Sequence, residues 1–187
     1  GTDEAAIAGA AQWAVETLVR RYLEAGQLEQ VAETQLRGAS LPFERMLRRK
    51  LNRDAAWTCS DQLQQPARAI GILQRLFDED PADEIALASV TRFARLLDEA
   101  GQHAELAALW EGQARCRAEA GDRPSAAALW ARAGRIWEVE LGDVERAIAV
   151  HREGAALGGE TSLESLARIY GDRKDLRAAA LVLEWLA

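Results

Sequence analysis

Turn signals recur at regular intervals along the chain, and they limit its fold more than any other feature. Glycine or polar residues interrupt the sequence at 26–27, 64–66, 101–102, 142–143 and 172–174. Between these breaks, apolar residues recur three and four positions apart, which is the period of an amphipathic helix. No segment shows the sustained alternation of apolar and polar residues that marks a half-buried strand. The sequence therefore predicts an all-α fold with no β-sheet.

The composition fits a folded helical chain. Alanine, the best helix former, supplies 38 of the 187 residues, and 49% of the chain is apolar. A chain of this length buries about 70% of its unfolded surface when compact, so we expect a folded protein. Because it has neither a run of 18 apolar residues nor a basic signal sequence, we expect a cytoplasmic protein that does not bind membranes. Arginine outnumbers lysine by 21 to 2, as in proteins from GC-rich bacterial genomes.

The breaks divide the chain into ten helices, paired as five antiparallel hairpins with no long linker. We expect hairpins at roughly 3–40, 41–80, 81–121, 122–158 and 160–187, which form a single domain. Small or apolar residues occupy the corresponding place in every second helix: Val31, Ala69, Leu106, Ala147 and Ala179. These positions lie 38, 37, 41 and 32 residues apart, so one structural unit recurs along the chain.

The recurring pattern resembles the tetratricopeptide repeat (TPR), which combines large, small and aromatic positions with a turn glycine and a closing proline. The best matches are Trp130, Gly134, Trp137, Gly142, Ala147 and Pro81, and the resemblance covers nearly the whole chain. The spacing is longer than the family's 34 residues, and two first helices carry an extra residue before the turn. The resemblance implies a right-handed superhelical solenoid of about five hairpins. A looser α-solenoid is the alternative.

Small residues recur where two helices of such an array would cross closely. They are Ala56, Ala94, Gly134 and Ala167 in the first helices, and Ala69, Ala147 and Ala179 in the second. Large residues flank them, and each hairpin has apolar residues on more than one face. Because no hairpin can bury those faces alone, we expect neighbouring hairpins to stabilise each other by stacking.

The sequence offers no catalytic or metal-binding constellation. Its two histidines, His103 and His151, belong to different hairpins, and neither an HExxH motif nor a CxxC pair occurs. We expect His151 to be a packing residue at the aromatic position of its repeat. The glycines of 154–159 predict a helix C-terminus, and the acidic run at 78–84 predicts capping in place of a calcium loop. We therefore expect no cofactor, no metal and no enzymatic activity.

The resemblance implies that one face of the first helices lines a concave groove. The residue after the small position would lie on that face, and it is arginine in four hairpins of five: Arg20, Trp57, Arg95, Arg135 and Arg168. Guanidinium groups recognise carboxylates through a planar fork of N–H donors. Arg53 and Trp57 would interrupt and widen this row, and Trp13 is a further aromatic anchor. These residues predict a surface for a partner peptide or helix that carries acidic groups.

Two plainer interpretations compete with this surface. Glu16 precedes Arg20 by four residues and Glu164 precedes Arg168 by four, so both arginines could form weak surface pairs. A second basic stretch, 42–53, suits either a solvated helix face or an anionic partner. Its basic residues are Arg45, Arg48, Arg49, Lys50 and Arg53. The net charge of −7 argues against nucleic acid as that partner.

The sequence thus predicts a protein-interaction scaffold without catalytic chemistry. The alternative is a structural spacer or self-association segment of a larger multidomain protein. The last helix is strongly apolar and lacks a polar cap, which favours a fragment of a longer chain and self-association through Trp185 and Leu186. A third hypothesis, an enzyme, would require a pocket with convergent titratable groups, which we do not expect.

Overall fold

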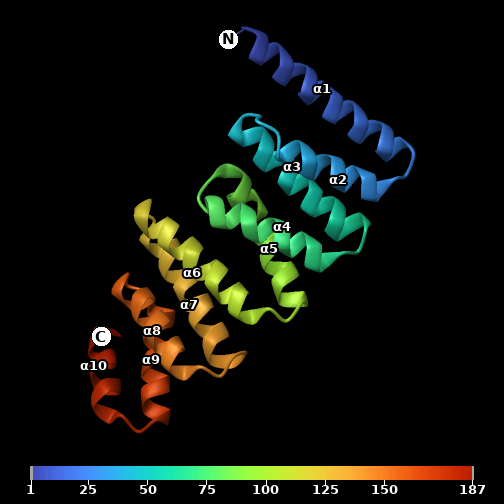
Figure 1. The fold of residues 1–187 in the computed structure, drawn as a ribbon. Coiled ribbons are helices and arrows are strands. Elements are labelled where there is room, and N and C mark those ends of the chain that lie inside the picture. Colours follow the sequence, from blue (N-terminus) through green and yellow to red (C-terminus); the bar gives the residue numbers. More distant parts are fainter. Residues whose placement is uncertain (1, 187) are drawn as a thin grey trace. The chain divides into compact units, whose positions relative to one another are not determined.

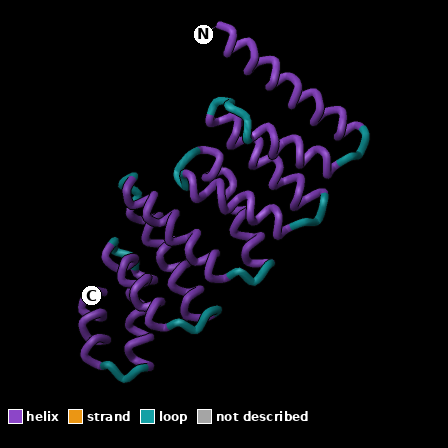
Figure 2. The backbone as a smooth tube through the Cα atoms, viewed as in Figure 1, coloured by secondary structure: helices purple, strands orange, loops and turns teal. Residues whose placement is uncertain are grey.

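The computed structural model describes residues 2–186 and the side chains of 6–182 and 184. The described residues form ten α-helices joined by loops, and no strand. The helices are α1 (Thr2–Glu24), α2 (Leu28–Ala39), α3 (Arg45–Trp57), α4 (Pro66–Glu79), α5 (Glu84–Glu99), α6 (His103–Glu119), α7 (Arg123–Val139), α8 (Val144–Ala156), α9 (Glu160–Asp172) and α10 (Leu176–Leu186). Short loops join consecutive helices as antiparallel hairpins (Figures 1 and 2). The predicted all-α fold of helix hairpins is confirmed.

The chain folds as two compact units, Gly1–Leu96 and Leu97–Ala187, and the boundary lies within α5. In unit 1, α1 packs on α2, α2 on α3, and α3 on α4. In unit 2, each helix from α6 to α10 packs on the next, and α7 also contacts α9. That last contact joins the first helices of two successive hairpins, as hairpin stacking requires. None of the described helices combines the length and the hydropathy needed to cross a bilayer.

One residue in the left-handed conformation closes every hairpin, at the same place relative to its second helix. These residues stand two positions before the second helix, with φ between 55° and 68°: Gly26, Gln64, Gly101, Gly142 and Lys174. Glycine adopts this conformation without steric cost, whereas Gln64 and Lys174 adopt it at a cost of about 1 kcal/mol or more. The hairpins therefore share one turn geometry even where the turn glycine is missing.

The second and fourth hairpins each carry the extra residue that the sequence predicts. The amide of Gln65 donates to the carbonyl of Cys59, and the amide of Asp143 donates to that of Trp137, both at 2.8 Å and across six residues. The matching bonds of the other three hairpins span five residues. In the second hairpin a π-helical turn, η1 (Thr58–Gln62), accommodates the addition directly after α3. The insertion therefore changes the end of a first helix and leaves the turn itself intact.

Close helix crossings in unit 2 depend on small residues, as predicted. Gly134 of α7 lies against the imidazole of His151 on α8, and a Cβ atom added at Gly134 would stand 2.6–2.7 Å from three atoms of that ring. His151 is only 1% exposed, which confirms its predicted packing role. At the next crossing, a Cβ atom added at Gly154 would meet Ser162 of α9 and Trp130 of α7. Neither crossing has room for a larger side chain.

Candidate functional site

Two of the predicted groove residues of unit 1, Arg53 and Trp57, lie together at the end of α3, of which Trp57 is the last residue. The guanidinium carbon of Arg53, one turn earlier, lies 4.5 Å from the centroid of the Trp57 ring, and that of Arg92 on α5 lies 4.7 Å from it. Cations over an aromatic ring at this distance are attracted by its negative face, by about 0.5–1 kcal/mol each. We call Arg53, Trp57 and Arg92 the Trp57 cluster.

Neighbouring carboxylates hold both arginines of the Trp57 cluster in place. Arg53 donates two hydrogen bonds to Asp54, at 2.6 and 2.9 Å, and Arg92 donates one to Asp61 at 2.5 Å. Burial by itself raises the pKa of Asp61. The hydrogen bonds from Ser60 and Arg92 and the charges of the nearby arginines together lower it by more, so the pKa of Asp61 lies below its ordinary value. The side chains of Arg53 and Arg92 stay 18% and 32% exposed, so both are fixed yet reachable from solvent.

Arg95 and Arg20 lie on the same unit but differ in their relation to the cluster. Arg95 is exposed on α5, one turn after Arg92, and its charge contributes to the lowered pKa of Asp61. Arg20 is exposed on α1, and no hydrogen bond or ion pair joins it to another described side chain. The plain pairing with Glu16 is not formed, because Glu16 instead accepts a hydrogen bond from Gln12 at 2.9 Å.

In unit 2, the two predicted arginines have different surroundings. Arg168 of α9 donates to both carboxylate oxygens of Glu138 on α7, at 2.6 and 2.8 Å. These hydrogen bonds outweigh burial and lower the pKa of Glu138. The expected partner Glu164 is thus replaced by a residue of the neighbouring hairpin. Arg135 is exposed on α7, and no hydrogen bond or ion pair joins it to another described side chain. Of these two residues, only Arg135 has its fork open to a partner.

Sequence reasoning missed a buried carboxylate in unit 2. Glu111 of α6 is 3% exposed and accepts hydrogen bonds from Trp137 Nε1 at 2.8 Å, Arg146 at 2.8 Å and Arg115 at 3.1 Å. The same two arginines lie over the rings of Trp137 and Trp130, at 5.5 and 5.4 Å from their centroids. The one available signal was an acidic residue beside a tryptophan in the core period of α6. This network ties α6, α7 and α8 together.

The basic stretch on α3 contains a second buried charge. The side chain of Arg49 is 2% exposed, so the interpretation as a solvated face is wrong at this position. Arg49 forms ion pairs with Glu79, at 2.9 Å, and with Asp83. It also donates to the backbone carbonyls of Leu76, at 2.7 Å, and Asp80, at 2.9 Å, beyond the reach of local sequence patterns. The acidic run at 78–84 therefore anchors a basic residue in addition to capping a helix.

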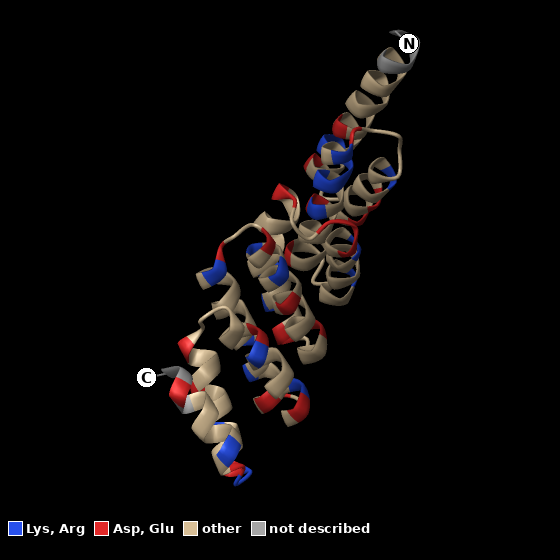
Figure 3. Cartoon of the chain, turned by 90° about the vertical axis from the view of Figure 1, so that its left-hand side faces the viewer, with Lys and Arg blue, Asp and Glu red and all other residues tan. Residues whose placement is uncertain are grey.

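The remaining candidate features are dispersed. Figure 3 shows basic and acidic residues interspersed along the helices of each unit. Trp13 is 67% exposed on α1, and Cys59 is buried whereas Cys116 is half-buried. Among the described side chains, no three histidine, cysteine or acidic groups gather as a metal site. The side chains of Trp185 and Leu186, predicted to mediate self-association, lie outside the described ones.

The helix hairpins, their shared left-handed turn and the small residues at their crossings together form a TPR-like repeat fold. No protein-family profile matches the chain, and no curated protein sequence matches it. Among solved structures, the chain is similar to a crystal structure of nearly identical TPR-like repeats from Podospora anserina. The two share 22% sequence identity over 91% of this chain and 90% of that one, with a TM-score of 0.46.

Proposed function

We propose that the chain is a non-catalytic scaffold that binds an acidic peptide or helix of a protein partner on the exposed face of its first helices. The observation that carries this proposal is the Trp57 cluster, in which two fixed arginines and a tryptophan lie together at the surface of unit 1. Tryptophan and arginine are the residues that most often dominate the binding energy of protein interfaces.

The geometry of the cluster suits carboxylates. Each guanidinium has five N–H donors, and Arg53 and Arg92 use only two and one of them on Asp54 and Asp61. Since these bonds and the Trp57 ring already restrict both side chains, little conformational entropy remains to be lost on binding. A carboxylate of the partner therefore meets donors that are oriented before it arrives. Arg95, one turn further along α5, extends the basic surface.

The two units are expected to contribute unequally to partner binding. In unit 1, the cluster and Arg95 combine an aromatic anchor with three positive charges. In unit 2, Arg135 offers an unpaired fork, whereas Arg168 is already bound by Glu138. We therefore propose that binding depends most on the residues around Trp57, followed by Arg135, and least on Arg168.

The test is capture of the partner by crosslinking and affinity purification from the source organism. The double variant that combines Arg95→Glu with Arg135→Glu is expected to reduce the amount of captured partner by at least about tenfold, while its helicity by circular dichroism stays unchanged. The matched control is Arg75→Glu, an exposed arginine of the second helix α4 that bonds the carbonyl of Gly71. Equal capture by the double variant and by the control would contradict the proposal.

Self-association through α10 is the alternative function. Leu176 and Leu181 are 75% and 57% exposed on this helix, and exposed leucines on one helix favour association. Sedimentation velocity over a range of concentrations tests it. A dimer that forms with rising concentration and is lost in Leu176→Glu would favour self-association over partner binding. A monomer at every concentration would exclude it.

A further inference from the structure

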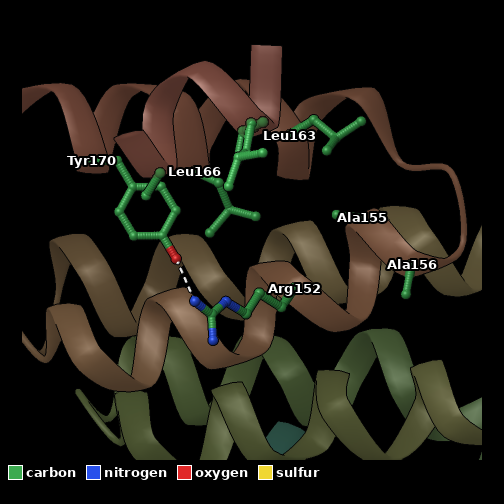
Figure 4. Close-up of a pocket in the computed structure, with 9 residues that line it drawn as sticks. Arg152, Ala155, Ala156, Leu163, Leu166 and Tyr170 are labelled. Atoms are coloured by element: carbon green, nitrogen blue, oxygen red, sulfur yellow. Dashed lines mark hydrogen bonds between the residues drawn. The ribbon is translucent and has the colours of Figure 1, made fainter. Parts of the chain in front are cut away.

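A cavity of about 420 Å³ lies within unit 2, between α8, α9 and α10 (Figure 4). Its lining consists of Arg152, Ala155, Ala156, Leu163, Leu166, Tyr170, Ala178, Leu181 and Val182. Seven of these side chains are aliphatic, and only Arg152 and Tyr170 bring polar groups. Pockets of about 300–1,000 Å³ with apolar walls and a few placed polar groups are typical of small-ligand sites. None of the residues of the Trp57 cluster belongs to this cavity.

The polar groups of the cavity include Arg152, an exposed cation that forms no ion pair with a described carboxylate. Arg152 donates a hydrogen bond of 2.8 Å to the hydroxyl of Tyr170, a neutral group (Figure 4). Among the described residues no acidic side chain forms an ion pair with Arg152. Glu145, the carboxylate on which its charge acts, is already bound by Arg173 at 2.5 Å. The remaining guanidinium donors are therefore suited to an anionic group that enters with a ligand.

The apolar wall has a defined length. Tyr170 marks the polar end of the wall on α9, and Leu163 lies seven residues before it on the same helix. At the rise of an α-helix, this separation is about 10 Å, the span of an extended alkyl chain of roughly eight carbons. Leu166 lies between the two, and the small side chains of Ala155 and Ala156 leave room on the opposite wall (Figure 4).

We propose that this cavity binds a medium-chain aliphatic carboxylate. Its carboxylate accepts hydrogen bonds from Arg152 beside the Tyr170 hydroxyl, and its alkyl chain lies along Leu166 and Leu163 toward Ala156. A cationic head group would be repelled by the guanidinium, and a neutral alcohol would lack the charge-assisted bond. The site is distinct from the proposed partner-binding residues, because its lining includes neither the Trp57 cluster nor Arg95, Arg135 or Arg168.

The test is a titration of the full chain with sodium octanoate, in which binding is monitored through the amide chemical shifts in NMR spectra. Octanoate is expected to bind with a Kd below about 1 mM and to shift the amides of α8, α9 and α10. Octan-1-ol and octylammonium, which have the same chain, are expected to bind at least about tenfold more weakly. Loss of octanoate binding in Ala156→Trp would show that the ligand occupies the cavity.

Charge recognition is tested by a matched pair of arginine variants. Arg152→Gln is expected to weaken octanoate binding about tenfold or more, because a charge-assisted hydrogen bond is lost. Arg177→Gln, an exposed residue of α10 outside the lining, removes the same charge and is expected to change binding little. Absence of octanoate binding, equal binding of the three head groups, or equal weakening by the two variants would each overturn the proposal. If Arg152→Gln fails to fold, octanoate binding to Ala156→Trp is measured in its place: loss of binding supports the proposal, and unchanged binding overturns it.

Discussion

Replacing Gly134 by alanine tests the packing of unit 2 at its tightest helix crossing. A Cβ atom at this position would stand 2.6 Å from Cε1, 2.6 Å from Nε2 and 2.7 Å from Nδ1 of His151. The imidazole is 1% exposed and fills the space between α7 and α8, so it cannot turn into solvent. The methyl group must therefore push the two helices apart or force the ring out of its rotamer.

Two opposing contributions set the size of the effect. Overpacking of a buried site costs about 1–3 kcal/mol. Replacing glycine by alanine inside a helix gains about 0.5–1 kcal/mol from helix propensity. Because three ring atoms are contacted at once, the cost prevails, and Gly134→Ala should lower the free energy of unfolding by about 1–2 kcal/mol.

The assay is urea unfolding followed by circular dichroism, with a glycine from the same unit as control. Gly112 lies inside α6, and a Cβ atom added there meets nothing within 4 Å. Gly112→Ala should therefore raise the free energy of unfolding by about 0.5–1 kcal/mol. If both variants stabilise the protein equally, the crossing is not as close as the structure indicates.

A double-mutant cycle identifies His151 as the cause. His151→Ala alone should destabilise the protein, because it leaves a cavity in the core. Once the ring is gone, however, Gly134→Ala should cost little, so the two substitutions should couple by about 1 kcal/mol or more. Additive effects would refute the direct contact between residues 134 and 151 as the origin of the strain.

Three further predictions concern single residues. Burial lowers the pKa of His151 below its ordinary value, so the unfolded chain takes up a proton more readily than the folded one. The free energy of unfolding should therefore fall as the pH drops below about 6.5. In urea titrations between about pH 7.5 and about pH 5.5, His151→Gln should show a smaller fall than the natural chain. Lys174→Gly should raise the melting temperature, because glycine adopts the left-handed backbone conformation of this turn without the cost of about 1 kcal/mol that lysine incurs. A lower melting temperature would show that the turn is not strained. Glu111→Leu should lower the free energy of unfolding by about 1–3 kcal/mol, since it leaves the Trp137 N–H unpaired; a neutral result in chemical unfolding would contradict the role of this network.

The helix hairpins were predictable because their signals are local. The apolar period, the turn glycines and the small residues at the crossings all lie within a few positions of the structure they specify. Gly134 and His151 illustrate this, since both occupy recurring places of the repeat. The same reasoning reaches the turn at Lys174 only through its position in the repeat, because lysine has no preference for positive φ.

The candidate site was predictable only in part, because its contacts join residues distant in sequence. The position after the small residue led to Trp57, but Arg92, 35 positions later, is found only from the structure, in which its guanidinium lies over the Trp57 ring. Likewise, Arg168 bonds Glu138, 30 residues away, in preference to the acid on its own helix. Long arginine side chains choose among several partners within reach, and tertiary packing decides between them.

The most direct measurement of the proposed function is the selection of binding peptides from a random display library on the immobilised chain. We expect enrichment of peptides that combine aspartate or glutamate with an apolar residue, and their affinity should fall as salt concentration rises. Binding of these peptides should drop about tenfold or more in Trp57→Ala combined with Arg92→Gln, and should persist in Arg75→Gln. Peptides without acidic residues, or acidic peptides that bind the Trp57 variant as tightly as the natural chain, would contradict a scaffold that recognises acidic partners through this cluster.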